Sequence, residues 1–134
     1  MYIKTIAVAM AFIITFLAVV GCTTTTQTTT AAAYVNLDAS EFMEKVDTEG
    51  VFTVDVHIPE QQHIRGTDAV IPFDEIESNI NEFPADKSTP IALYCRSGSM
   101  STSASQELID LGYTTVYNLL GGVYAWEDAG FEFE

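Results

Sequence analysis

The chain has 134 residues, 48% of them hydrophobic, which is enough for one small domain with a core of its own. Its 19 acidic residues against 5 lysines and arginines give a formal net charge of −14. A surface this acidic repels nucleic acids and anionic lipid headgroups, which excludes a nucleic-acid partner.

The first 21 residues have the pattern of a secretion signal. Lys4 supplies a positive charge, and residues 6–20 are an uncharged apolar run, shorter than the roughly 18 to 20 residues of a membrane span. Residues 19–22 (VVGC) resemble a lipoprotein signal-peptidase site, at which Cys22 receives lipid and becomes the new N-terminus. An uncleaved anchor helix is the alternative. Both interpretations place the domain outside the cytoplasmic membrane. A lipidated chain would be held at the outer face of that membrane or at the periplasmic side of an outer membrane.

A tether is expected over residues 22–33. The stretch TTTTQTTTAAA after Cys22 has no charge, no periodicity and no large side chain, so it cannot bury enough apolar surface to fold alone. We therefore expect one folded domain, over residues 34–134.

Apolar runs alternate with helical patterns in that domain, which indicates an α/β fold with a parallel sheet. Strands are expected at residues 34–37, 51–56, 68–71, 91–94 and 114–119. The run 91–94 (IALY) carries no charge, which is typical of a central strand buried on both faces.

Helices are expected at residues 39–47, 74–83, 101–111 and 123–129. Asp38 is an N-cap with Glu41 three residues later, the pattern of a capping box. In the second helix Ile76, Ile80 and Phe83 share one face. In the last helix we expect Trp126 to face the core.

Cys95 lies between the strand 91–94 and the helix expected from Ser101. Unpaired N–H groups and the positive end of the helix dipole meet at a helix N-terminus, and they favour a thiolate over a thiol. Cys22 is the other cysteine of the chain, and lipid on its sulfur would prevent a disulfide with Cys95. We therefore expect Cys95 to be a reactive free thiol. A buried structural cysteine is the alternative.

Four motifs resemble the rhodanese, or sulfurtransferase, family in order and spacing. Residues 95–101 (CRSGSMS) are similar to its active-site loop C-R-x-G-x-R-S. Residues 54–60 (VDVHIPE) resemble its D-V-R-x-P-E segment, residues 63–66 (HIRG) its G-H-I-x-G, and residues 112–126 its G-Y-x-x-V-x-x-L-x-G-G-x-x-A-W. The resemblance covers nearly all of the chain from residue 34, and it implies a small parallel five-stranded sheet with helices on both faces.

The resemblance implies a two-step sulfur transfer without a cofactor or a metal. The Cys95 thiolate takes a sulfane sulfur from thiosulfate or a persulfide and passes it to cyanide or a thiol. Backbone N–H groups of the loop and the hydroxyls of Ser99 and Ser101 would hold the persulfide. We expect a monomer, with these loop residues at the site: Arg96, Ser97, Gly98, Ser99, Met100 and Ser101.

Met100 departs from the family pattern, which commonly has Arg or Lys there to hold the sulfonate end of thiosulfate. Without that charge we expect weak thiosulfate activity and a less charged persulfide or polysulfide as the donor. Few basic residues follow the signal, so Arg96 is expected to be the main cation near an anionic substrate.

The resemblance gives Asp55 a mostly structural, supporting role. His57 stands where the family often has Arg, and His63 matches the histidine of G-H-I, which we interpret as a hydrogen-bonded structural residue. A metal site of both histidines with Cys95 is the alternative, although these residues lack the close paired spacing of a zinc site. The segment between Pro59 and His63 is shorter than in typical members, which predicts an altered pocket rim.

Two other functions stay open. A non-catalytic interaction module is possible because a fold does not fix a function. Phosphatases and arsenate reductases also begin their loop with Cys and include Arg, but the resemblance implies a longer loop ending in Arg. Here the six residues 95–100 are expected to precede the helix, and the last of them is Met.

Overall fold

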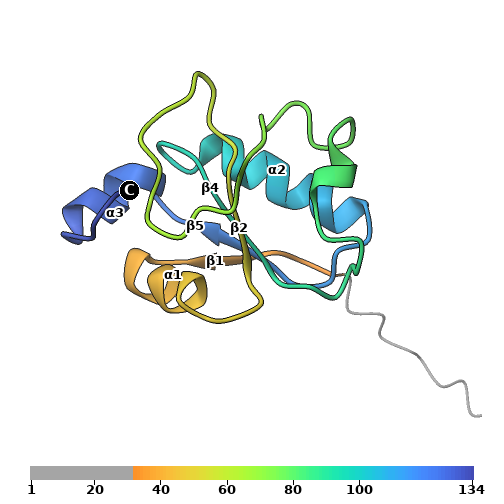
Figure 1. Cartoon of the computed structure of the whole chain (residues 1–134), viewed down its shortest axis with the longest axis horizontal. Helices are drawn as coiled ribbons and strands as arrows, with labels where there is room; N and C mark the ends of the chain where they lie inside the picture. The colour runs from red at the N-terminus through yellow and green to blue at the C-terminus, as the bar shows by residue number, and fades with distance from the viewer. Residues whose placement is uncertain (1–31) are drawn as a thin grey trace, which may run out of the picture.

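The computed structural model describes residues 32–134, which form a sheet with helices on both sides (Figure 1). Five parallel strands run in the order β1-β5-β4-β2-β3, so the strand that leads to Cys95 is the central one. The predicted fold class and strand number are confirmed. The strands are β1 (Val35–Leu37), β2 (Phe52–Asp55), β3 (Ala69–Val70), β4 (Ile91–Tyr94) and β5 (Val116–Leu119).

Each face of the sheet carries its own apolar cluster. On one face α1 (Ala39–Val46) and α3 (Gly122–Asp128) cover a cluster that includes Trp126. On the other face α2 (Ser99–Asp110) covers a second cluster, in which Leu108 is fully buried. Figure 1 shows α1 and α2 on opposite sides of the strands. The two clusters bury both faces of the sheet, and this packing holds the C-terminal end of β4 in position.

The predicted capping box starts α1. The Asp38 carboxylate accepts the N–H of Glu41 at 2.9 Å, and the Glu41 carboxylate accepts the N–H of Asp38 at 3.1 Å. Phe42 in the first turns is fully buried. Local chemistry therefore sets this helix start as the sequence indicated.

The helix predicted at residues 74–83 is wrong. The segment is a series of turns with one short 3-10 helix, η1 (Ile80–Glu82). The Asn79 amide and the Ser78 hydroxyl both donate to the carbonyl of Glu75, at 2.9 Å and 3.2 Å, and such side-chain bonds favour turns over helix. The apolar residues still point inward, because Ile76 is fully buried and Phe83 nearly so.

The ends of several elements differ from the prediction by one or two residues, and one of these differences affects the site. Helix α2 begins at Ser99 rather than at Ser101, so four residues rather than six separate β4 from the helix. This loop is even shorter than the one that the sequence predicted. Ser101, whose N–H donates to the Cys95 sulfur, therefore lies in the first turn of α2.

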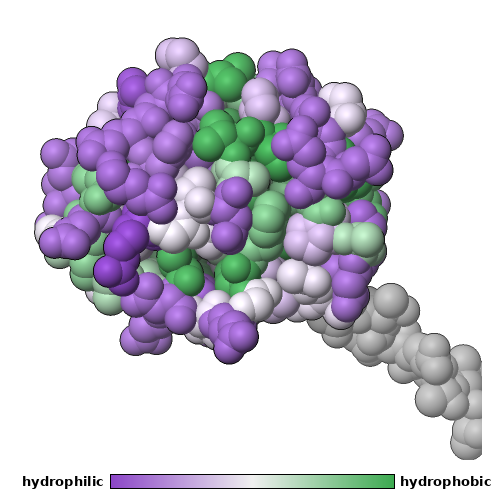
Figure 2. All heavy atoms as spheres, viewed as in Figure 1, coloured by the Kyte–Doolittle hydropathy of each residue, from purple (hydrophilic) through white to green (hydrophobic). Residues whose placement is uncertain are grey.

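Hydrophilic side chains cover most of the face drawn in Figure 2, in keeping with the acidic composition. Among residues 32–134 there is no helix whose length and apolar character would let it cross a bilayer. The predicted signal at residues 1–21, the lipidation site Cys22 and the tether up to residue 31 lie outside the described residues.

Candidate active site

Cys95 follows β4 directly, where the chain turns into α2. Its Sγ accepts the N–H of Gly98 at 3.1 Å and the N–H of Ser101 at 3.4 Å. The Ser101 hydroxyl donates to the same sulfur at 3.5 Å. Amide donors at a helix N-terminus stabilise negative charge, so this nest can hold a thiolate or a departing sulfur.

Cys95 is also buried, with 1% of its surface exposed, and it belongs to the apolar cluster beneath α2. Burial by itself suits the structural alternative. A structural cysteine, however, has no need of two amide donors and a hydroxyl, whereas a buried anionic sulfur requires them. The polar donors around Sγ therefore favour a reactive role.

The N-terminus of α3 braces the loop from the other side. The N–H of Val123 donates to the carbonyl of Cys95 at 2.9 Å, and the N–H of Tyr124 donates to the carbonyl of Arg96 at 3.2 Å. Gly122 has φ +57° and lies so close that a Cβ there would stand 2.6 Å from the carbonyl carbon of Arg96. The Gly-Gly pair of the last motif thus lets one helix end contact the active loop.

The other predicted loop residues differ in what they offer. Gly98 has φ +95°, a left-handed conformation that turns its N–H toward the sulfur. Ser97 and Ser99 are exposed, and within residues 32–134 their hydroxyls have no hydrogen-bond partner. Met100 is half-buried against the apolar cluster. Of the two hydroxyls expected at the persulfide, only that of Ser101 hydrogen-bonds to Sγ within the described residues.

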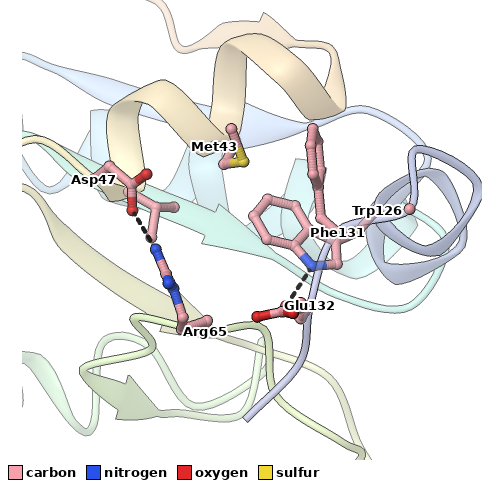
Figure 3. A pocket seen from close by; sticks show the side chains of 8 residues that line it. Met43, Asp47, Arg65, Trp126, Phe131 and Glu132 are labelled. Atoms are coloured by element: carbon pink, nitrogen blue, oxygen red, sulfur yellow. Dashed lines mark hydrogen bonds and ion pairs between the residues drawn. The ribbon is translucent and has the colours of Figure 1, made fainter.

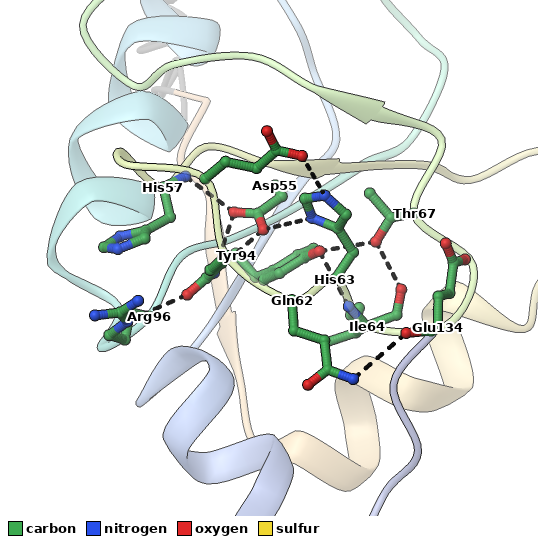
Figure 4. A network of polar contacts seen from close by, with 11 residues as sticks. Asp55, His57, Gln62, His63, Ile64, Thr67, Tyr94, Arg96 and Glu134 are labelled. Atoms are coloured by element: carbon green, nitrogen blue, oxygen red, sulfur yellow. Dashed lines mark hydrogen bonds and ion pairs between the residues drawn. The ribbon is translucent and has the colours of Figure 1, made fainter.

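Asp55 ends β2 and is fully buried. Its carboxylate accepts the backbone N–H of His57 at 2.9 Å and an amide N–H of Gln61 at 3.2 Å, and it lies 3.0 Å from Nδ1 of His63 (Figure 4). These partners satisfy a buried charge and fix the chain after β2. This is the geometry of a supporting residue.

Gln61 links this network to the loop that begins at Cys95, and no motif in the sequence pointed to this residue. Its Oε1 accepts the Nε–H of Arg96 at 3.4 Å, while its amide nitrogen donates to Asp55. Arg96 is exposed and directly follows Cys95. The shortened segment before His63 indicated a changed rim, but only the fold distinguishes Gln61 from Gln62.

A separate hollow of about 180 Å³ lies between α1 and the C-terminal segment (Figure 3). The hollow is bordered by an ion pair between Arg65 and Asp47, whose side-chain atoms are 3.3 Å apart. It is also bordered by the Trp126 indole, which donates a hydrogen bond to the carbonyl of Glu132 at 3.0 Å. It holds no nucleophile and lies on the face of the sheet opposite the Cys95 side chain. We therefore place the candidate site at the loop and not in this hollow.

Within residues 32–134, no group of three or more His, Cys, Asp and Glu side chains is placed to hold a metal ion. His63, one member of the alternative metal set, is instead engaged by the carboxylates of Asp55 and Glu60.

The comparison with known proteins decides the family. The rhodanese-like domain family matches residues 27–129. The chain belongs to this family. A sulfurtransferase of Allochromatium vinosum is 33% identical over 97 residues, which is 70% of this chain and 89% of that protein. The thiosulfate sulfurtransferase GlpE of Pseudoalteromonas translucida is 30% identical over 102 residues, 72% of this chain and 92% of its own.

The fold comparison agrees. A rhodanese-related protein from Thermoplasma volcanium has a crystal structure with a TM-score of 0.64 and 23% identity, covering 75% of this chain and 98% of that one. Family membership and the named relatives together support the predicted enzyme class, a rhodanese-type sulfurtransferase.

In this rhodanese-like domain His63 couples stability to pH. Burial opposes a charge on its ring, but hydrogen bonds with Asp55 and Glu60 and the charges of both carboxylates outweigh burial, so the pKa of His63 is raised above its ordinary value. A raised pKa in the folded state stabilises the fold fully below the unfolded pKa of about 6.5. The contribution disappears as the pH rises through the folded pKa.

We therefore expect His63→Gln to lower the free energy of unfolding by about 1 kcal/mol near pH 6 and by less near pH 9. Urea unfolding of both proteins at the two pH values measures this difference. A loss of equal size at both values would contradict a stabilising charge on His63.

Proposed function

We propose that this protein is an exported, membrane-tethered sulfurtransferase that moves sulfane sulfur through a Cys95 persulfide. The observation that carries the proposal is the nest of Gly98 N–H, Ser101 N–H and Ser101 hydroxyl around Sγ, at a helix N-terminus of a rhodanese-like domain. The nest suits an anionic sulfur that must attack once and leave once.

In the first step the Cys95 thiolate attacks the outer sulfur of the donor. The S–S bond of the donor breaks, and its remainder leaves with the electron pair, as sulfite from thiosulfate or as a thiolate from a persulfide. In the second step a thiolate or cyanide attacks the outer sulfur of the persulfide, Cys95-S-SH. The new S–S bond breaks, and Cys95 leaves as a thiolate that the amides of Gly98 and Ser101 stabilise.

The proposed donor is a weakly charged persulfide or polysulfide. Met100 is half-buried and brings no charge to the loop, and the Arg96 guanidinium next to the nucleophile is drawn toward Gln61. An anionic sulfonate would thus lack a charge-assisted partner from position 100, an interaction of about 1.5 to 3 kcal/mol.

Restoring a cation should improve the use of thiosulfate. We expect Met100→Arg to lower the KM for thiosulfate by one to two decades, the equivalent of that lost interaction. Met100→Gln is the matched control, because it changes the packing and polarity without adding charge. The effect is measured as the steady-state rate of sulfur transfer from thiosulfate to cyanide. Equal KM values for the Arg and Gln variants would contradict the idea that a missing positive charge at position 100 weakens thiosulfate binding.

Mass spectrometry of the protein after exposure to a sulfane-sulfur donor tests the proposed function. A sulfurtransferase gains the mass of one sulfur atom on the peptide that contains Cys95 and loses it when a thiol or cyanide is added. An inert Cys95 would overturn the proposal and favour the non-catalytic interaction module.

A further inference from the structure

Both ring nitrogens of His57 are buried, and neither has a hydrogen-bond partner among residues 32–134. The residue as a whole is 9% exposed. Leaving a buried polar group unpaired costs about 1 to 3 kcal/mol, so native proteins rarely do it without a reason. Because this ring lies at the edge of the candidate active site, its unpaired nitrogens indicate that the substrate supplies the missing hydrogen-bond partner.

His57 lies on the strand connection next to Cys95. The register pairs Asp55 of β2 with Tyr94 of β4, and the N–H of Val56 continues the ladder to the carbonyl of Tyr94 at 2.9 Å. The same register carried forward sets His57 beside the first residues of the active loop. Figure 4 shows the imidazole of His57 on the Arg96 side of Asp55, turned away from His63.

The surroundings of His57 keep its ring neutral. Burial lowers the pKa of His57, the positive charge of Arg96 lowers it further, and the carboxylate of Asp55 only partly opposes them. One ring nitrogen therefore has a free lone pair near pH 7. An arginine, which the family pattern often has at this position, carries only donors and could not accept a proton.

We propose that His57 is a catalytic base for thiol acceptors, which deepens and rests on the proposed sulfur transfer. A ring nitrogen takes the S–H proton of the acceptor thiol, and the thiolate so formed attacks the outer sulfur of Cys95-S-SH. The Cys95 S–S bond breaks, the acceptor becomes a persulfide, and Cys95 leaves as a thiolate in its amide nest. The imidazolium then returns its proton to solvent.

The test separates loading from discharge. Cys95 is first converted to its persulfide with a sulfane-sulfur donor, and mass spectrometry confirms the added sulfur. The outer sulfur is then transferred to a small thiol or to sulfite. Sulfite attacks through a lone pair on its sulfur. At a pH above the pKa of bisulfite it is already deprotonated, so its attack requires no catalytic base. His57→Gln keeps a donor and an acceptor on a side chain of similar reach but cannot take a proton.

We expect His57→Gln to load normally, to lose about 100-fold in discharge to the thiol near pH 7, and to change little with sulfite. The deficit should shrink near pH 9, where the acceptor thiol ionises without help. His57→Arg should show the same loss with the thiol, since arginine supplies charge and donors but no base.

Equal losses with thiol and sulfite, or no loss with the thiol near pH 7, would overturn the role of His57 while leaving the proposed function intact. Failure of the unsubstituted protein to load Cys95 would instead overturn the sulfur transfer itself. The midpoint of urea unfolding, measured on each variant, separates a chemical effect from a folding defect.

Discussion

Replacing Cys95 with serine is expected to abolish sulfur transfer, lowering turnover at least about 10³-fold. Serine keeps the size of the side chain and can still bond to Gly98 and Ser101, so the fold should survive. Its oxygen, however, is neither ionised near pH 7 nor able to form a persulfide. The measurement is turnover of a persulfide donor together with the mass of the treated protein.

Cys22→Ser is the matched control, because the chain has two cysteines and either could bind sulfur. This variant should load and turn over as the unsubstituted protein does. In a cell that processes lipoproteins it should also lose the lipid that we propose as the anchor. Sulfur found on the Cys95→Ser protein, or a dead Cys22→Ser protein, would contradict the assignment of the nucleophile.

The sequence predicted those parts of the fold that depend on neighbours along the chain. The uncharged run of β4, the Asp38–Glu41 capping box and the cysteine at the start of a tight loop are local patterns, and the structure contains all three. The false helix at 74–83 also had a local apolar pattern. There the side chains of Ser78 and Asn79 favoured turns, and burial of Ile76 did not require a helix.

The parts of the site that sequence could not predict join residues far apart in the chain. Gln61 and Arg96 are 35 positions apart, and they meet because β2 and β4 are neighbours in the sheet and end at the same edge. The same adjacency leaves the His57 ring buried beside the loop, without a hydrogen-bond partner in the described part of the chain. The family resemblance identifies the residues of the motifs. Gln61, which joins Asp55 to Arg96, lies instead in the segment between Pro59 and His63, where the chain departs from the family pattern.

Gly122→Ala should have the second large effect, on stability as well as activity. An alanine at φ +57° costs about 1 to 2 kcal/mol, and its Cβ would stand 2.6 Å and 2.7 Å from the carbonyl carbon and oxygen of Arg96. The atoms in contact belong to the backbone of the loop and of α3, which cannot move aside as a flexible side chain can. Overpacking therefore adds about 1 to 3 kcal/mol to the cost of the substitution. We expect the free energy of unfolding to fall by about 2 to 5 kcal/mol, as urea unfolding would show.

Gly130→Ala is the control that separates the two causes. Gly130, which follows α3, also has a positive φ of +78°, but a Cβ there would meet no atom of residues 32–134 within 4 Å. It should therefore cost only the backbone strain, about 1 to 2 kcal/mol, and leave sulfur transfer unchanged. If α3 braces the loop through its bonds to the carbonyls of Cys95 and Arg96, Gly122→Ala should also slow persulfide formation in protein that remains folded. Equal effects of the two substitutions would mean that the close approach of α3 to the loop matters neither for folding nor for the nucleophile.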